Sequence, residues 1–165
     1  MNELDKILTE WEDDCKIDNV HLDETSRKTP VLHSKYLSLL SQAKIQHRKC
    51  EFKQKTLLKD KWLWYNGKMS EDEIIEKGWN PDPFNGLKVL KGEMEHYYDS
   101  DPEIQKSEEL LQYWKTVIDT LTEIVNNLNW RHQTISNIIK WKQFESGNYT
   151  TLIYILNVII VLQQK

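Results

Sequence analysis

The sequence contains few residues that interrupt helices or cross-link a chain. Of its 165 residues, five are glycine and four are proline, so long helices can run without a break. The two cysteines, Cys15 and Cys50, form no CxxC pair, which argues against a disulfide framework and indicates reduced thiols. The N-terminus MNELDKILTEW is charged and has no apolar core segment, so we expect no signal peptide.

The familiar sequence patterns of enzymes are also missing. There is no Walker loop, no GxGxxG and no HExxH. The acidic residues within 13–18 are predicted to form a solvated face, and those within 99–103 lack the glycine that a calcium loop requires. We therefore predict no catalytic residues, no metal site and no cofactor. A small metal-dependent nuclease acting through these acids stays as a minor alternative.

Apolar residues recur at steps of three and four in two long stretches, which is the pattern of helices that pack as in coiled coils. The first helix is predicted to begin at Thr29-Pro30, because threonine can cap a helix and proline suits its first position. It should end near Asn66-Gly67, and Gln46 and Lys53 weaken its seam. The apolar seam residues are Leu32, Tyr36, Leu39, Ala43, Cys50 and Leu57.

The second long helix is predicted to begin at Asp101-Pro102 and to end near Gly147. Its apolar stripe is too broad for a seam with one other helix, which favours several subunits in a bundle or ring. A helical bundle within one chain, using the same face, is the alternative. The residues predicted to carry self-association are Leu111, Trp114, Ile118, Leu121, Val125, Leu128, Ile135 and Ile139.

The predicted fold class is all-α, with long helices and coiled-coil-like seams that assemble into an oligomeric helical bundle or ring. Within a helical domain of residues 1–147 we expect a short N-terminal helix (1–16), a long helix (29–66), an irregular connector (67–100) and an oligomerisation helix (101–147). Inside the connector, Ser70 and Glu73 predict a capped acidic helix that ends at Lys77. A hydrophobic tail follows at 148–165. Its apolar run, 149–162, is shorter than the roughly 20 residues of a membrane span, so no membrane contact is expected and its role stays open.

Positive charge is concentrated between Lys44 and Lys68. This segment carries eight Lys or Arg and two acids, a net charge of +6, whereas the rest of the chain carries −10. Cations attract phosphates, and aromatic rings stack on unpaired bases, so the segment is predicted to bind single-stranded nucleic acid. The alternative is a solvated lysine face that ends in ordinary core tryptophans. The candidate residues are Lys59, Lys61, Lys55, Lys53, Arg48, Lys49, Trp62, Trp64 and Tyr65.

Four blocks of sequence, in their order and spacing, resemble the UvsY family of recombination mediators from T-even-like phages. They are HSKYLSLLS (33–41), QKTLLKDKWLWYNG (54–67), NPDPFNGLKVLKGEMEHYYDSD (80–101) and LQYWKTVIDTLTEIVNNLNWRHQTISNIIKWKQFESG (111–147). The resemblance implies a non-enzymatic, ring-like homo-oligomer that binds single-stranded DNA in the cytoplasm of the infected bacterial host. It also implies two protein partners: a UvsX-type recombinase, which such proteins load onto DNA, and the phage single-strand-binding protein that coats that DNA.

The resemblance also suggests which residues act. In the family a Lys-x-Arg pair just before the aromatic turn contributes to DNA binding, and Lys59 and Lys61 occupy those positions here. Lysine at the second position keeps the charge but lacks the bidentate geometry of arginine. The alternative function is a coiled-coil scaffold or assembly protein without nucleic-acid binding. The subunit number, the surface that meets the recombinase, and whether Trp62 and Trp64 stack on bases or pack in the protein stay open.

Overall fold

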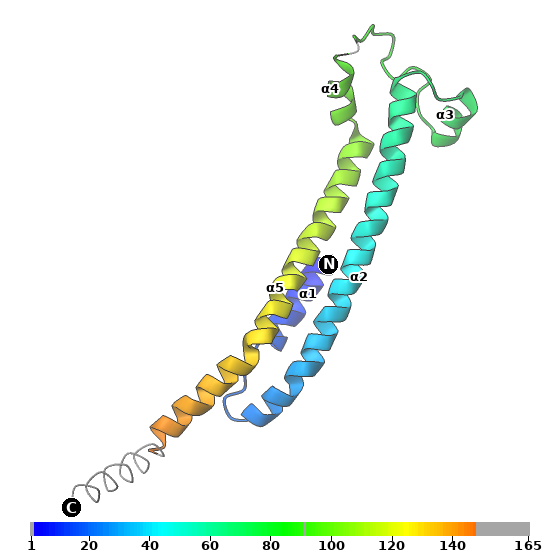
Figure 1. The fold of residues 1–165 in the computed structure, drawn as a ribbon. Coiled ribbons are helices and arrows are strands. Elements are labelled where there is room, and N and C mark those ends of the chain that lie inside the picture. Colours follow the sequence, from blue (N-terminus) through cyan, green and yellow to red (C-terminus); the bar gives the residue numbers. More distant parts are fainter. Residues whose placement is uncertain (1, 91, 148–165) are drawn as a thin grey trace, which may run out of the picture. The chain divides into compact units, whose positions relative to one another are not determined.

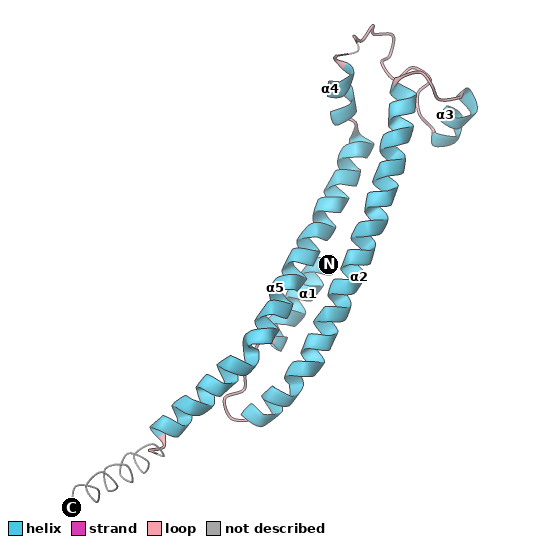
Figure 2. Cartoon of the chain, in the orientation of Figure 1, coloured by secondary structure: helices cyan, strands magenta, loops and turns pink. Residues whose placement is uncertain are grey.

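A computed structural model describes residues 2–90 and 92–147 of the chain, and the regular structure in these residues is helical (Figures 1 and 2). The helices are α1 (Glu3–Asp14), α2 (Leu22–Tyr65), α3 (Glu71–Lys77), α4 (Met94–Asp99) and α5 (Pro102–Glu145). The predicted all-α fold is confirmed. None of these helices is long and apolar enough to cross a membrane. The apolar run 149–162 lies outside the described residues.

The first long helix begins earlier than predicted. It begins at Leu22, and the N–H of Thr25 donates to the carbonyl of His21 at 3.0 Å. Asp23 and Glu24 occupy the first turn, where negative charge interacts favourably with the helix dipole. Pro30 therefore lies inside α2, although it has no N–H to donate to the preceding turn. Proline occurs often in the first turn of a helix but is not confined to it, so the predicted start at Thr29-Pro30 was wrong.

The end of α2 agrees with the prediction. Gly67 adopts a φ of +64°, in the left-handed region that favours glycine. Its N–H donates to the carbonyl of Trp64 at 3.0 Å, and the N–H of Lys68 donates to that of Leu63 at 2.8 Å. This pair of bonds is the Schellman motif, and it satisfies carbonyls that the last turn would otherwise leave free.

The connector contains more helix than predicted. Helix α3 has the expected capping box between Ser70 and Glu73. Helix α4, in the segment predicted to be irregular, was not foreseen because Met94–Asp99 is too short to show a helical period and has no side-chain cap. Helix α5 begins as predicted, since the Asp101 carboxylate accepts from the N–H of Glu103 at 2.9 Å and from that of Ile104 at 3.2 Å.

The chain divides into two compact units. Unit 1 comprises the residues up to Leu39 together with those from Leu121 onward, and unit 2 comprises Leu40–Thr120. The buried apolar residues of unit 1 are Ile7, Tyr36, Leu121, Ile124, Leu128 and Ile135. Those of unit 2 are Leu40, Ala43, Trp64, Tyr65, Ile74, Ile104 and Val117.

In unit 1, α1 is held against α2 by an aromatic contact and by charge. The Trp11 ring meets the Tyr36 ring edge-on, with centroids 5.4 Å apart. The Lys35 ammonium lies 2.8 Å from the carboxylate of Glu10 and 2.7 Å from that of Asp14. The Tyr36 hydroxyl donates to Asp14 at 3.0 Å. A short helix with one fully buried residue, Ile7, therefore depends on polar contacts for its position.

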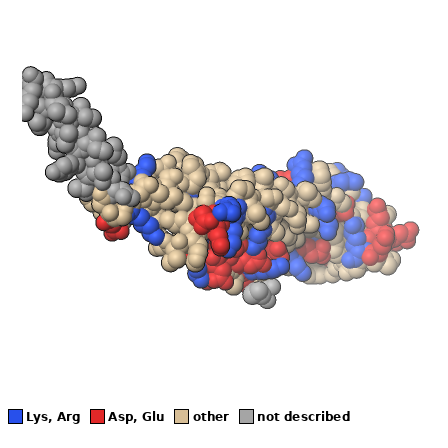
Figure 3. Space-filling view, turned by 90° about the horizontal axis from the view of Figure 1, so that it is seen from below, with Lys and Arg blue, Asp and Glu red and all other residues tan. Residues whose placement is uncertain are grey.

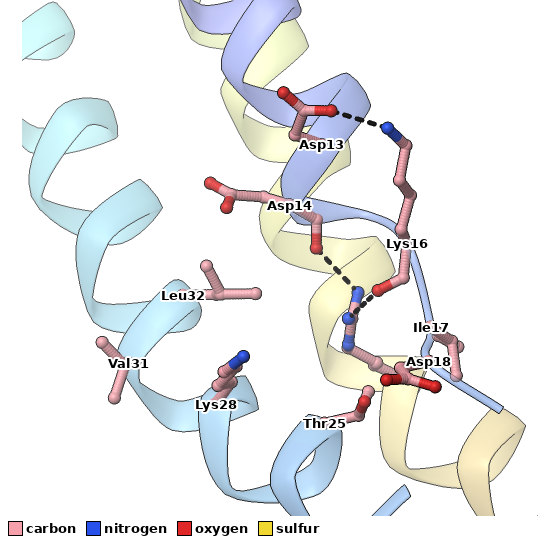
Figure 4. A pocket seen from close by; sticks show the side chains of 10 residues that line it. Asp13, Asp14, Lys16, Ile17, Asp18, Thr25, Lys28, Val31 and Leu32 are labelled. Atoms are coloured by element: carbon pink, nitrogen blue, oxygen red, sulfur yellow. Dashed lines mark hydrogen bonds and ion pairs between the residues drawn. The ribbon is translucent and has the colours of Figure 1, made fainter. Parts of the chain in front are cut away.

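Arg131 of α5 adds hydrogen bonds at the C-terminal end of α1. Its buried guanidinium donates to the carbonyls of Asp14, Cys15 and Lys16, at 3.1, 3.0 and 2.6 Å. The Asp14 carbonyl belongs to the last turn of α1 and the other two follow it, so these carbonyls lack acceptor roles within the helix. The pocket of about 380 Å³ drawn in Figure 4 lies here, between this end of α1 and the side chains of Thr25 and Leu32 on α2.

Replacing Arg131 with methionine is expected to release α1. The change removes three charge-assisted hydrogen bonds while keeping much of the side-chain volume, and should lower the free energy of unfolding by about 2–4 kcal/mol. Urea denaturation measures this loss, and hydrogen exchange over residues 3–16 should show faster exchange of α1. The exposed neighbour His132, replaced with glutamine, is the control. Unchanged protection of α1 in Arg131→Met would contradict the role of this residue.

The eight residues predicted to carry self-association do not share one environment. Leu121, Leu128 and Ile135 are buried in the core of unit 1, so they have little surface left for a second subunit. The others are half-buried or exposed: Leu111, Trp114, Ile118 and Val125 are half-buried and Ile139 is exposed. Self-association through α5 stays a prediction, and it now depends on those five residues.

Candidate nucleic-acid interface

The two faces of α2 differ in unit 2. Its buried face includes Leu40, Ala43, Lys61 and Trp64, and the half-buried residues between them continue the same steps of three and four. This register differs from the predicted seam, which included Gln46 and Lys53; both are exposed, and the half-buried positions are His47 and Gln54. The remaining basic residues of the segment lie outside the buried face.

One exposed face of α2 combines cations with aromatic rings. Successive steps of four, four, three, four and three residues place its members on one side of the helix. We call this face the basic stripe; it consists of Lys44, Arg48, Phe52, Lys55, Lys59 and Trp62. Phe52 is 55% exposed and Trp62 is 48% exposed, so both rings are accessible beside the cations of this face.

Cations lie over both exposed rings. The Arg48 guanidinium is 4.6 Å from the centre of the Phe52 ring, and the Lys68 ammonium is 4.4 Å from that of Trp62. Arg48 also pairs with Glu51 at 2.7 Å, and this hydrogen bond is the main reason that the pKa of Glu51 is lowered. Each ring is thus accompanied by a positive group that can contact a phosphate next to a stacked base.

Phe52 was missed by sequence reasoning, which looked for aromatic residues only near the tryptophans. The available signal was its position four residues after Arg48 on the same helical face. Lys49 and Lys53, both predicted to bind DNA, are exposed but lie beside the stripe rather than on it. On the face drawn in Figure 3, lysine and arginine side chains lie among aspartates and glutamates. The number of basic residues therefore does not by itself identify a binding surface, and we define the surface by the positions of its residues on α2.

Trp64 and Tyr65 are packed inside the protein. Together with Ile74 they form a buried aromatic cluster, surrounded by Met69, Trp79, Phe84, Met94, Tyr97 and Tyr98. The Trp64 indole N–H donates to the carbonyl of Asn80 at 2.7 Å, and its ring centroid lies 5.1 Å from that of Trp79. Neither residue is available to stack on a base, in contrast to Trp62.

Lys61 is buried as well, with only 3% of its surface exposed. Its ammonium lies 2.9 Å from the Asp101 carboxylate, 3.4 Å from that of Glu103, and over the rings of Trp64 and Trp79. Burial opposes ionisation of Asp101, but hydrogen bonds from Lys61, Ile104 N–H and Tyr65 keep its pKa below the usual value. The expectation that Lys61 contacts phosphate is therefore corrected, because its charge is neutralised inside the protein.

The arrangement on α2 suits a flexible polyanion with unpaired bases. Five positive side chains, those of Lys44, Arg48, Lys55, Lys59 and Lys68, are exposed along or beside two accessible rings. In the part of the chain that the structure describes, no three His, Cys, Asp or Glu side chains are grouped so as to hold a metal ion.

The fold agrees with known crystal structures. The structure superposes on the bacteriophage T4 recombination mediator protein UvsY in lattice type II with a TM-score of 0.73, at 24% identity, covering 89% of this chain and 100% of that one. For lattice type IV the TM-score is 0.72, at 23% identity, with 87% and 99% covered. These similarities establish the fold.

The sequence comparison agrees. The recombination protein uvsY of Enterobacteria phage T4 is 26% identical over 144 residues, which cover 87% of this chain and 98% of that protein. Residues 10–148 match the family model described as "Recombination, repair and ssDNA binding protein UvsY". This match spans most of the sequence and includes α2 with its basic stripe. The chain therefore belongs to the UvsY family of recombination, repair and single-stranded-DNA-binding proteins.

Proposed function

We propose that this protein is a recombination mediator that acts by binding rather than by catalysis. It binds single-stranded DNA through the basic stripe of α2 and promotes the loading of a UvsX-type recombinase onto DNA coated by the phage single-strand-binding protein. It acts in the cytoplasm of the infected bacterial cell. Membership of the family supports the general function, and the exposed rings of Phe52 and Trp62 among cations support the site.

Two physical effects contribute to binding, and the second favours a single strand. Each phosphate that a lysine or arginine neutralises releases counterions, so binding to any nucleic acid weakens as salt increases. Base stacking on an exposed ring contributes about 1–3 kcal/mol, and it requires bases that are not already stacked in a duplex. If several subunits assemble, as predicted, their stripes act at high effective concentration and many weak contacts combine into tight binding.

A coiled-coil scaffold without a DNA role is the competing function. It accounts for the buried faces of α2 and α5, which any helical assembly needs. It gives no reason for four cations, Lys44, Arg48, Lys55 and Lys59, to share one exposed face with the rings of Phe52 and Trp62. The composition of this face is the observation that favours the DNA-binding function.

Replacing Lys59 with glutamine is expected to weaken binding to single-stranded DNA. Loss of one phosphate contact should reduce the slope of log K against log salt by about 0.7. Fluorescence anisotropy with a labelled oligothymidylate at several salt concentrations measures this slope. The control is Lys115→Gln, because Lys115 is an exposed lysine of α5 in the same unit. Equal slopes for the two variants would exclude Lys59 as a contact, and a wild type without salt-dependent binding would favour the scaffold.

The loading step needs its own test. The DNA-dependent ATP hydrolysis of the phage recombinase is measured on single-stranded DNA that already carries the single-strand-binding protein. We expect the wild-type protein to shorten the lag, and Lys59→Gln to shorten it less at the same concentration. A protein that binds DNA but leaves the lag unchanged would contradict the mediator function while leaving DNA binding in place.

A further inference from the structure

We propose that Lys61 is a positioning residue, whose ion pair with Asp101 fixes the last turns of α2 and so sets the end of the basic stripe. Replacing Asp101, although it is an acid, should then weaken DNA binding just as replacing Lys61 does. This inference rests on the proposed function, because it concerns how the DNA-binding face is held.

The environment of Lys61 leaves its charge no access to DNA. The ammonium lies 2.9 Å from one carboxylate and 3.4 Å from a second, with indole rings centred 4.7 and 4.1 Å away. A phosphate in this space would have to displace the Asp101 carboxylate, which is 4% exposed and of the same charge. Lys59, two residues earlier, lies on the opposite, exposed side of the helix.

The Asp101 carboxylate joins α5 to α2, and its partner Tyr65 extends the connection to α4. One oxygen accepts from the N–H groups of Glu103 and Ile104 and so caps α5. The other accepts from the Lys61 ammonium at 2.9 Å and from the Tyr65 hydroxyl at 3.0 Å, both in the last two turns of α2. The same Tyr65 hydroxyl lies 3.3 Å from the carbonyl of Tyr97 in α4.

These bonds fix the part of α2 that carries the end of the stripe. Trp62 follows Lys61 directly in the chain, and Lys68, which lies over the Trp62 ring, follows the turn that ends the helix. Without the ion pair, the last turns lose their charged attachment to the start of α5, and Asp101 keeps a buried negative charge without its cation. Trp62 and Lys68 would then no longer be held in line with Lys55 and Lys59.

The sign of the effect of Asp101 distinguishes positioning from phosphate contact. The variants are Lys61→Met, Asp101→Asn and the double variant, tested in the full chain with the oligothymidylate. We expect each single variant to weaken binding about tenfold, the scale of one lost charged interaction, with an unchanged salt slope. The double variant should be no weaker than either single one, because both changes remove the same interaction. Lys61→Arg, which keeps the charge, should restore most of the affinity.

Two results would overturn this inference. One is that Asp101→Asn binds as tightly as the wild type, or more tightly; the other is that Lys61→Met reduces the salt slope as Lys59→Gln does. Both leave wild-type binding intact, so they differ from failure of the proposed function, in which the wild type itself shows no salt-dependent binding.

A second measurement avoids variants that do not fold. Exposed lysines of the wild-type chain are acetylated with a small amine-reactive ester, with and without oligothymidylate, and the modified positions are found by mass spectrometry. We expect Lys59 to react in the free protein and to be protected by DNA, whereas Lys61 stays unreactive in both states. A Lys61 that reacts in the free protein and is protected by DNA would contradict the positioning role.

Discussion

Trp64→Ala is expected to destabilise unit 2 by about 3–5 kcal/mol, the usual cost of removing a large ring from a core. Trp64 belongs to the buried aromatic cluster and donates to the Asn80 carbonyl at 2.7 Å, so the change leaves a cavity and removes a hydrogen bond. Trp62→Ala removes an exposed ring and should change stability by less than about 0.5 kcal/mol. Urea denaturation of the two variants measures the difference.

For DNA binding the order should be reversed, with Trp62→Ala affected more strongly than Trp64→Ala. At a temperature where both are folded, Trp62→Ala is expected to lose about 1–3 kcal/mol of binding free energy for the oligothymidylate, as for one stacked base. Trp62→Phe, which keeps a ring, is the control and should retain most of this energy. If Trp62→Ala destabilised the protein as much as Trp64→Ala while binding DNA normally, the two tryptophans would have been assigned to the wrong roles.

A variant without the four cations of the stripe is expected to lose nearly all binding. With Lys44, Arg48, Lys55 and Lys59 replaced by glutamine, the affinity for single-stranded DNA should fall roughly 100- to 1000-fold at 0.1 M salt. All four side chains are exposed, and Arg48 forms an exposed ion pair with Glu51. The helical content and the unfolding transition should therefore stay close to those of the wild type, because exposed ion pairs contribute little to stability.

A matched control separates position from total charge. Replacing Lys6, Lys28, Lys106 and Lys115 with glutamine changes the net charge by the same amount, and all four residues are exposed outside the stripe. We expect this variant to bind within a fewfold of the wild type. An equal loss of DNA affinity in the two variants would mean that binding depends on the net charge of the protein rather than on the basic stripe of α2.

Local signals in the sequence predicted most helix ends correctly. Gly67 ends α2, Ser70 and Glu73 cap α3, and Asp101 with Pro102 begins α5, because each feature acts within one helical turn. The start of α2 was wrong because Pro30 is accommodated inside the helix, where acidic residues of the first turn support an earlier start. Helix α4 was missed because six residues carry no period.

The site was harder to predict, because burial depends on residues far apart in the chain. Lys59 and Lys61 look alike in the sequence, but two residues along a helix differ by about 200° in direction. Lys61 follows Leu57 by four residues and precedes Trp64 by three, so its place on the apolar face could have been recognised. Its partner Asp101 lies forty residues later in sequence, beyond α3 and α4, and no local pattern connects the two.

The same limit applies to the apolar residues of α5. A stripe that is too broad for one partner helix predicts additional contacts, but it does not show which residues face the subunit's own core. The structure buries Leu121, Leu128 and Ile135 in unit 1 and leaves Ile139 exposed. The helical period of α5 was predicted correctly. Which of its apolar residues are buried in unit 1 depends also on the packing of α1, and the Arg131 hydrogen bond to Asp14 that holds α1 joins residues more than a hundred positions apart.

The salt dependence of binding tests most directly whether the stripe on α2 is the DNA-binding surface. The affinity of the full chain for oligothymidylate is measured by anisotropy at increasing salt, for the wild type, the four-cation stripe variant and its matched control. We predict that the slope of log K against log salt falls by roughly 2.8 in the stripe variant, for four phosphate contacts, and is unchanged in the control. Parallel slopes for all three proteins would contradict this placement of the DNA.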